Sequence, residues 1–545
     1  MPARLSPHNL AALFWVLLMG AALYARPHLP VDETRYLAVA WEMWLRGDFL
    51  VPHLNGETYS HKPPLLFWLM QAGWQVFGVN EWWPRLVAPL FGLGCLFLVR
   101  RLAIELWPDD PCTHDLAPMF LVGCAFWSLF VTLTMFDMML AFFGLLGLLG
   151  VLIAYRKPGL LGLCYLAVAV GLGLLTKGPA ILLHILPVAL TAPLWFPRMS
   201  GATQPATDKP GFWYLKLLIA VGVGIGLALA WAIPAGIAGG DAYQQEIFWG
   251  QAAGRMVQSF AHQRPLWWYT ALLPVLVLPW FIWPPLWKAI RAYGAEFWRD
   301  GASLMCLIWF ATAFIAFSLI SGKQLHYLLP EFPALALLLA RSLSKSDFKA
   351  EGRRHLLLPV GVFGVLGAVL ILLQFGMLPG RLPVWSSEVD GLWGFGLIAV
   401  ALAAFVYAPA KITNNVIVLS ALPLTLVVVL HLALAPVLQA RYNMAPLAKQ
   451  LQAWERDGIT IAYFGKYHGQ FQFLGRLTQP MKVIGRRDND VADFLQENPD
   501  SRVITYYKIL PTRADPVVTY PFRQGVMAVW DHATLVANPG IENRL

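Results

Sequence analysis

The charged residues of this chain gather in a few short segments that separate long apolar runs. Asp32, Glu33 and Arg35 stand almost together, and a second cation, Lys62, precedes a pair of prolines. A further carboxylate, Asp137, lies alone between two apolar stretches. Fixed cations in a water-poor site stabilise developing negative charge far better than water does. Charged residues of both signs, gathered in short segments between apolar runs, therefore mark candidates for a reaction site that opens at one face of the membrane.

Three other segments carry residues of the same kinds. Lys177 interrupts two apolar runs, and the 237–264 segment contains Arg255 and His262. A short turn then presents Lys323 and, four residues later, Tyr327. We expect all of these segments to meet at one membrane face, because charge in the hydrocarbon core costs about 2.5–3.5 kcal/mol per residue.

Each candidate also has a purely structural interpretation. Asp32 and Arg35, three residues apart, could cap a helix and form a surface ion pair. Lys62 could anchor to lipid headgroups, Asp137 could occupy a turn at the membrane surface, and Lys177 could extend to the interface from an apolar helix. No single residue decides between the two interpretations.

The composition excludes a water-soluble fold. The chain has 545 residues, of which 58% are hydrophobic and only 13% are charged, about half the usual charged share. The mean hydropathy is +0.57. Five cysteines without a CxxC pair predict neither a disulfide framework nor a zinc site. The net charge of +9 indicates basic loops near anionic lipid rather than nucleic acid.

Thirteen apolar stretches approach the 20 or so residues that a helix needs to cross a bilayer. They lie at 10–25, 84–99, 116–136, 138–155, 158–176, 178–197, 217–236, 265–287, 301–321, 325–340, 355–380, 391–410 and 412–435. We read the first stretch as an uncleaved anchor rather than a secretion signal. The sequence thus predicts an all-α polytopic membrane domain of about 13 transmembrane helices over residues 1–438.

The loops predict the orientation of these spans. One set of alternate loops holds sixteen Lys and Arg residues and the other set holds nine, and the richer set is expected on the cytoplasmic side. The 26–83 loop, which begins as an amphipathic helix, and the 237–264 loop then lie outside, together with the C-terminus.

The end of the chain has a different composition. From Arg441 to Leu545, 23 of 105 residues are charged. The pattern there predicts a small α/β domain over residues 439–545, with helices at 447–456 and 491–497 and strands at 459–464, 481–484 and 503–507.

The polar segments occur in a characteristic order. In sequence they are Asp32–Tyr36, Tyr59 with Lys62 and Pro63, Asp137, Thr176–Gly178, His262 with Pro265 and Tyr269, and Lys323 with Tyr327, Leu329 and Pro330. This ordered set resembles the lipid A aminoarabinose transferase (ArnT) branch of the protein O-mannosyltransferase-like, GT-C glycosyltransferase family. Two positions depart from its pattern: His61 stands where relatives carry glutamate, and Trp268 stands where they commonly carry tyrosine.

The resemblance implies a GT-C fold and a defined activity. Such an enzyme would transfer 4-amino-4-deoxy-L-arabinose from undecaprenyl phosphate to a lipid A phosphate, with inversion, and so confer resistance to polymyxin and other cationic antimicrobial peptides. It would be a multi-pass protein of the bacterial inner membrane, with its active site and C-terminal domain in the periplasm. The expected partners are the lipid-linked sugar, lipid A and the membrane, without nucleic acid, and we expect a monomer.

Within this expectation each candidate has a role. Arg35, Lys62 and Arg255 would bind the donor phosphate. Asp32 and Asp137 would be the catalytic carboxylates, orienting the sugar and stabilising positive charge at its anomeric carbon. The remaining substrate-binding candidates are Glu33, Tyr59, Lys177, His262, Lys323 and Tyr327.

The resemblance implies a reaction that requires no cofactor, and an acceptor phosphate that is already ionised at neutral pH hardly needs a general base. Glu33, His61 and His262 could nevertheless hold a divalent cation. Two other functions remain open: a transferase that uses a different polyprenyl-phosphate sugar, on protein Ser/Thr for example, and a secondary transporter. The transporter is disfavoured because the sequence shows no internal repeat and its charges lie at one membrane face.

Overall fold

The computed structural model describes residues 6–157, 159–199, 210–254, 263–346, 352–380, 382–485 and 490–543. It contains two compact units, and each is described by itself. The first unit comprises Met1–Ala22, Ser60–Val369 and Leu392–Leu430, and the second comprises Leu23–Tyr59, Leu370–Gly391 and His431–Leu545.

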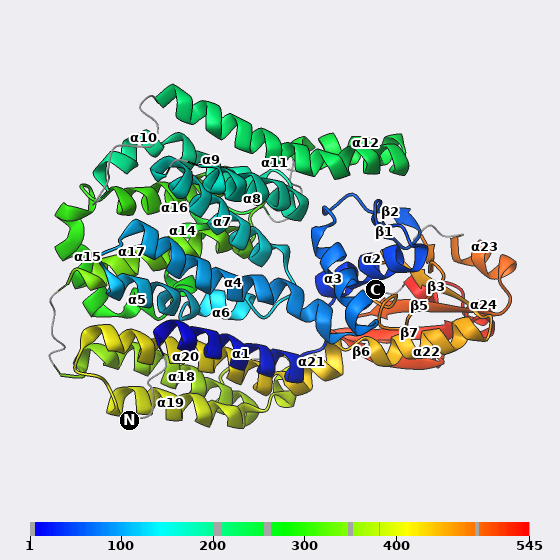
Figure 1. Ribbon diagram of the computed structural model, residues 1–545. Helices are drawn as coiled ribbons and strands as arrows, with labels where there is room; N and C mark the ends of the chain where they lie inside the picture. The colour runs from blue at the N-terminus through cyan, green and yellow to red at the C-terminus, as the bar shows by residue number, and fades with distance from the viewer. Residues whose placement is uncertain are drawn as a thin grey trace. The chain divides into compact units, whose positions relative to one another are not determined.

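The first unit is built from helices (Figure 1). In chain order they are α1 (Pro7–Ala25), α3 (Leu65–Phe77), α4 (Trp82–Leu106), α5 (Pro111–Val122), α6 (Ala125–Phe130), α7 (Phe136–Arg156), α8 (Leu161–Lys177), α9 (Ala180–Leu190), α10 (Ala192–Trp195), η1 (Phe196–Arg198), α11 (Pro210–Gly239), α12 (Asp241–Gln245), the π-helix η2 (Glu246–Gly254), α14 (Trp268–Leu276), η3 (Trp280–Ile282), α15 (Pro284–Phe297), α16 (Gly301–Leu319), η4 (Leu325–Glu331), α17 (Phe332–Ser344), η5 (Arg354–Leu356), α18 (Leu357–Gln374), α19 (Gly394–Val406) and α20 (Ile412–Ala433). The ends of α1, α18 and α20 continue into residues of the second unit.

Seven helices among the described residues are long and apolar enough to cross a membrane. They fall on seven of the predicted spans: α1, α4, α7, α11, α16, α18 with its preceding turn, and α20. The predicted polytopic all-α architecture is therefore confirmed.

The other six predicted spans are shorter or interrupted. The 116–136 stretch is divided between α5 and α6, and the 265–287 stretch between α14 and α15. The 178–197 stretch is the pair α9 and α10, bent by 41°. Prolines lie inside or between these helices, among them Pro118, Pro187 and Pro279. Each removes one backbone donor and so weakens the helical hydrogen bonding of its segment. Hydropathy alone does not register this interruption.

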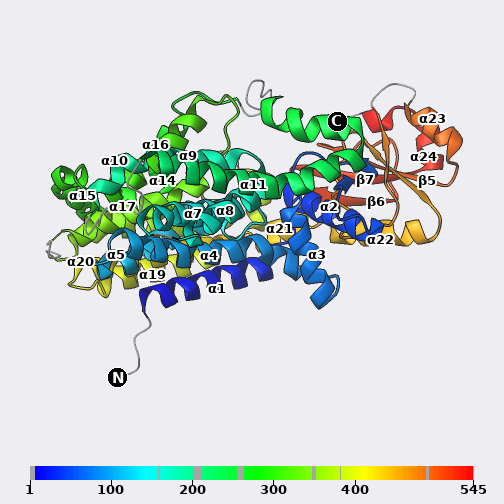
Figure 2. The same cartoon turned by 45° about the horizontal axis from the view of Figure 1, so that its top comes forward.

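Helices α1 and α4 lie side by side in both views (Figures 1 and 2). The Trp15 indole of α1 donates to the Pro89 carbonyl of α4 at 3.0 Å. That bond joins the two helices at the level of Pro89.

Helices α7 and α8 approach each other closely enough for their backbones to touch. A Cβ atom at Gly162 would lie 2.3 Å from the Ala154 nitrogen, and one at Gly150 would lie 2.7 Å from the Leu166 nitrogen. Glycine is needed at both positions because any side chain would separate the helices. The pairing is antiparallel, so the first turn of α7 lies beside the last turn of α8.

The second unit is an α/β assembly. Its elements are α2 (Asp32–Arg46), β1 (His53–Leu54), β2 (Glu57–Thr58), η6 (Val384–Glu388), α21 (Ala435–Tyr442), α22 (Ala445–Arg456), β3 (Thr460–Phe464), β4 (Lys482–Ile484), α23 (Asp490–Glu497), β5 (Ser501–Tyr507), β6 (Val518–Phe522), β7 (Gly525–Asp531), α24 (His532–Ala537) and η8 (Ile541–Asn543), with η7 (Gly391–Trp393) at its junction with the first unit. The predicted helices and strands correspond to α22, β3, β4, α23 and β5. The small α/β domain is therefore confirmed.

The strands β6 and β7 were not predicted. They form a hairpin in which Phe522 pairs with Gly525, so the turn is Arg523-Gln524 rather than the Asn-Gly or Gly-X pairs that usually mark a two-residue turn. Strand β6 also contains Pro521, which is tolerated because β6 is at the edge of the sheet.

The five-stranded sheet has the order β4-β3-β5-β7-β6. Strand β3 pairs in parallel with both β4 and β5, whereas β7 runs antiparallel to β5 and β6. Helices α23 and α24 bury Leu495 and Leu535 in the same apolar core as Val503 and Trp530 of the sheet.

The second unit also includes much of the first loop. On α2, the Trp41 indole donates to the Leu477 carbonyl at 3.0 Å, and the Asn55 amide donates to the Met481 carbonyl at 3.0 Å. More of the chain therefore groups with the C-terminal segment than the boundary at residue 439 anticipates.

Candidate active site

Asp137 and Lys177 form an ion pair across the α7–α8 contact. Helix α7 begins after the extended residue Met135, so Asp137 falls in its first turn, while Lys177 is the last residue of α8. The Lys177 Nζ atom lies 2.5 Å from Asp137 Oδ1. The side chains are 14% and 3% exposed, so the pair is largely removed from water.

The turn η4 completes this cluster. The Lys177 Nζ atom lies 4.7 Å from the centroid of the Tyr327 ring, a cation–π contact. The second carboxylate oxygen of Asp137 lies 3.9 Å from His326 Nε2. Lys177, Asp137 and Tyr327 were predicted, but His326 was not; its position next to Tyr327 in a polar turn is the signal that could have identified it.

Lys62 lies close to the same carboxylate. Its Nζ atom is 5.7 Å from the centroid of the Phe136 ring, in the residue before Asp137, and its charge acts electrostatically on Asp137. The exposed His61 precedes it. The first unit thus brings together one carboxylate and two ammonium groups, an arrangement that can hold both a phosphate and a cationic sugar substituent.

Lys323 has a different environment. Its side chain is buried and its Nζ atom donates to the Arg264 and Ile320 carbonyls at 3.0 and 2.5 Å. Beside it, Gln263 and Gly322 form a β-bridge. Burial lowers the pKa of Lys323. Through these hydrogen bonds Lys323 holds the loop at Arg264 against its own loop after Ile320.

Asp32 and Arg35 form an ion pair on α2, in the second unit. Their side chains are 51% and 25% exposed, so this face of the helix is open. Partial burial opposes the charge of Arg35, but neighbouring Tyr59 and Asp32 raise its pKa. Tyr59 is itself buried. The predicted Asp32–Arg35 pairing is present, with Tyr59 beside it.

Glu33 turns inward, unlike the exposed Asp32 beside it. Its carboxylate is buried, pairs with Arg26 and accepts from the Leu29 backbone N–H at 2.8 Å. Burial by itself would raise its pKa, but the Arg26 guanidinium outweighs it and brings the pKa of Glu33 to about 2. The geometry thus gives Glu33 a structural partner, and its predicted substrate and metal roles stay predictions.

Arg255 and His262 lie outside the described residues. Among the residues that are described, no group of three or more His, Cys, Asp or Glu side chains could hold a metal ion. Whether the chain needs a cofactor stays a prediction.

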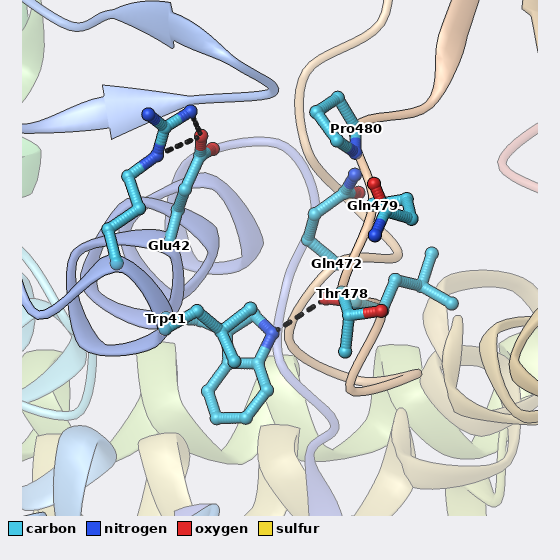
Figure 3. A pocket seen from close by; sticks show the side chains of 9 residues that line it. Trp41, Glu42, Gln472, Thr478, Gln479 and Pro480 are labelled. Carbon is cyan, nitrogen blue, oxygen red and sulfur yellow. Dashed lines mark hydrogen bonds and ion pairs between the residues drawn. The ribbon is translucent and has the colours of Figure 1, made fainter.

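A small cavity lies between α2 and the 472–480 segment of the second unit (Figure 3). Its volume is about 210 Å³, and it is lined by Trp41, Glu42, Leu45, Arg46, Gln472, Leu477, Thr478, Gln479 and Pro480. The Glu42 carboxylate accepts from Arg46 at 2.7 Å and from the Gly56 N–H at 2.9 Å. None of the predicted site residues lines this cavity, and we assign no chemistry to it.

Comparison with known proteins gives consistent results. The profile of the family described as dolichyl-phosphate-mannose-protein mannosyltransferase matches residues 10–235. A protein of Pseudomonas paraeruginosa named undecaprenyl phosphate-alpha-4-amino-4-deoxy-L-arabinose arabinosyl transferase is 30% identical over 383 residues, which cover 68% of this chain and 66% of that relative. A protein of the same name from Erwinia tasmaniensis is 28% identical over 383 residues, again covering 68% of this chain and 66% of that relative.

The fold has a solved counterpart. The crystal structure of ArnT from Cupriavidus metallidurans bound to undecaprenyl phosphate superposes with a TM-score of 0.75 at 19% identity, covering 96% of this chain and 97% of that one. A helical membrane bundle of this fold, followed by a small α/β domain, defines a GT-C glycosyltransferase architecture. The chain belongs to the aminoarabinose transferase (ArnT) family within the protein O-mannosyltransferase-like glycosyltransferases, as its motifs predicted.

Proposed function

We propose that this protein transfers 4-amino-4-deoxy-L-arabinose from undecaprenyl phosphate to a phosphate of lipid A. The observation that carries the proposal is the Asp137–Lys177–Lys62 cluster, found in a chain whose curated relatives are named for that sugar and that lipid carrier. The matched region covers 66% of those relatives, so the activity is inferred from both the site and the names.

The cations account for departure of the lipid phosphate. As the bond between the anomeric carbon and the phosphate oxygen breaks, its electron pair stays on that oxygen. Lys62 and Arg35 would stabilise the negative charge that develops there, and burial makes such stabilisation stronger than in water. Arg255 is the third residue proposed for this role.

The carboxylates explain how the sugar is bound and how positive charge on it is stabilised during transfer. An oxygen of the acceptor phosphate attacks the anomeric carbon from the face opposite the departing phosphate, which inverts that centre. No proton has to be removed from an ionised phosphate, so neither Asp32 nor Asp137 is required as a base. We assign them to the amino group of the sugar and to positive charge at the anomeric carbon. Lys177, which itself lies over the Tyr327 ring, holds the Asp137 carboxylate in place.

The location follows from the distribution of charged loops. We propose that the chain lies in the bacterial inner membrane with the site and the α/β domain on the periplasmic side. A lipid-linked donor suits that side, because it reaches the site from within the bilayer and requires no nucleotide. The enzyme would act as a monomer without a cofactor, and its product would reduce binding of polymyxin to the cell surface.

Mass spectrometry of lipid A tests the proposal directly. Cells that express the chain should show aminoarabinose on lipid A, and the Asp32→Asn, Arg35→Gln and Lys62→Gln variants should not, although each variant reaches the membrane in normal amounts. Full modification by all three variants would refute the assigned site. Unmodified lipid A with a wild-type chain present would favour another acceptor or another polyprenyl-phosphate sugar, the second candidate.

A further inference from the structure

The sheet of the second unit has a topological switch point at one edge. Strand β3 is followed in the chain by β4 on one side of it, and the chain then returns through α23 to β5 on the other side. In open α/β sheets, ligands bind outside the carboxyl ends of the strands where the connections diverge in this way. That position is the edge formed by the ends of β3 and β5.

Two basic residues follow β3 at this edge. The strand ends at Phe464, and the next turn carries Lys466 and His468. Gly469 has φ +75, and a Cβ atom there would lie 2.6 Å from Leu54 Cδ1 and 2.9 Å from Ala38 Cβ. The turn is therefore packed tightly on β1 and α2, and Ala38 lies one helical turn from Arg35.

A third basic residue comes to the same edge from the β6–β7 hairpin. Tyr507, the last residue of β5, pairs with Val526, so the hairpin turn that contains Arg523 lies beyond the carboxyl end of β5. Arg523 has φ +53 and is the first residue of a two-residue turn. Glycine is usual at such a position, and a non-glycine residue there costs about 1–3 kcal/mol. Arginine at this position therefore carries a backbone cost that glycine would avoid.

The hairpin turn is anchored. The Arg523 N–H donates to the Arg441 carbonyl at 3.1 Å, and Arg441 Nη1 donates to the Arg523 carbonyl at 3.3 Å. Arg441 itself pairs with Glu388. The backbone that presents Arg523 is therefore fixed, while Arg523 as a residue is exposed.

The charges at this edge do not cancel. Burial lowers the pKa of His468, and the neighbouring charges of Arg35, Lys466 and Arg523 lower it further, whereas Asp32 acts in the opposite direction. Asp32 is paired with Arg35. Within the described part of the chain, neither Lys466 nor Arg523 has a carboxylate partner at ion-pair distance. Two exposed cations therefore lie near the His468 imidazole, on which Arg35 of α2 also acts.

We propose that Lys466, His468 and Arg523 bind a phosphate of the lipid acceptor, so that the α/β unit is an acceptor-recognition element adjoining Arg35. This inference rests on the proposed function and adds the residues that would select the acceptor. Two separate cations and an imidazole donor suit a phosphomonoester dianion, which carries more charge than the phosphodiester of an ordinary phospholipid headgroup.

The test separates acceptor recognition from donor recognition. The purified protein is placed in phosphatidylcholine vesicles, and transfer is measured as lipid A and donor are varied independently. The double variant Lys466→Gln/Arg523→Asn should raise KM for lipid A about tenfold, which corresponds to roughly 1.4 kcal/mol, with KM for the donor and kcat unchanged. Asparagine tolerates a left-handed backbone, so the turn should be retained.

Three further arms make the outcome specific. The variant Lys449→Gln/Arg456→Gln removes the same charge from exposed positions on α22, away from this edge, and should leave KM for lipid A unchanged. The variant Lys466→Arg/Arg523→Lys, which keeps both positive charges, should have the wild-type KM for lipid A. His468→Gln, which keeps a hydrogen-bond donor, should raise the KM for lipid A less than His468→Ala does.

Several results would overturn the inference. An unchanged KM for lipid A in the double variant would do so, and so would an equal rise in KM for the donor. If the defect appears only when phosphatidylglycerol is added, the edge binds anionic lipid in general and the acceptor assignment is wrong. Equilibrium binding of fluorescent lipid A to the same vesicles gives a readout without turnover, so failure of the transferase proposal would be distinguishable from failure of this one.

Discussion

The Lys177 ammonium lies 2.5 Å from the Asp137 carboxylate, although forty residues separate the two in the chain. The contact exists because α7 and α8 are antiparallel and pack through glycines, which places the start of one helix beside the end of the other. Each charge is thereby held at a helix end with its partner already in place. A site arranged in this way requires little reorganisation when charge develops on a substrate.

The first prediction concerns this pair. Asp137→Asn should lower the rate of aminoarabinose transfer at least 100-fold, because the amide cannot stabilise positive charge at the sugar or neutralise Lys177. The rate of transfer to lipid A in vesicles measures the effect. Asp109→Asn, which changes an exposed carboxylate in the same unit, serves as the control and should keep full activity. Wild-type activity of Asp137→Asn would contradict the catalytic assignment.

The second prediction concerns the buried Glu33–Arg26 pair and pH. Glu33 has a pKa of about 2, below its ordinary value of 4.5, so its ionised form stabilises the folded state above pH 4.5, and this contribution is lost as the pH falls toward 2. The shift corresponds to about 3 kcal/mol. Glu33→Gln should therefore destabilise the protein at pH 7 by about that amount.

The difference between wild type and Glu33→Gln should shrink as the pH is lowered from 5 to 3. Thermal unfolding in detergent, followed at several pH values, measures it. Glu57→Gln, at an exposed position of β2, is the matched control and should behave as wild type. A difference that stays constant with pH would show that the pair does not control stability through the Glu33 charge.

The third prediction concerns a buried polar network around Asp300. Its Oδ2 atom accepts from the Trp107 indole at 2.7 Å, from the Tyr293 hydroxyl at 2.5 Å and from the Ser303 hydroxyl at 2.9 Å. Asp300→Ala would leave the Trp107 indole and one of the two hydroxyls without an acceptor, because Tyr293 and Ser303 can still bond to each other at 3.0 Å. The unfolding free energy should therefore fall by about 3 kcal/mol. Thermal melting should show this loss, whereas Glu296→Ala, on the exposed surface of α15, should melt near wild type.

The fourth prediction concerns the turn that packs on the first loop. Gly469→Ala should destabilise the second unit, because the new Cβ would clash with Leu54 and Ala38 as well as adopt φ +75. Gly458→Ala is matched to it: φ is +78, but nothing lies within 4 Å of the added atom. The Gly458 variant should cost about 1 kcal/mol and the Gly469 variant 1–3 kcal/mol more. Equal melting temperatures for Gly469→Ala and Gly458→Ala would show that the 469 turn shifts to accommodate the added methyl group without losing stability.

Local pattern was enough to predict much of the α/β unit and several long helices. Helix α22 and strands β3 and β5 show clear periodicity, and α7 and α11 are uninterrupted apolar runs. The broken helices near Pro187 and Pro279 were not predicted, because mean hydropathy measures polarity and not backbone hydrogen bonding. The β6–β7 hairpin was missed because Arg523 occupies a turn position that glycine usually fills.

The amino-acid sequence by itself determined which segments are apolar enough to lie in a membrane and that the charged residues stand at their ends, because the cost of charge in hydrocarbon acts on each segment separately. Only the tertiary structure decided which of those charges meet. Adjacent side chains on α2 point about 100° apart, so Asp32 faces outward to Arg35 while Glu33 turns inward to Arg26. The approach of His326 to Asp137 likewise depends on helix packing over long distances in the chain, which no local pattern encodes.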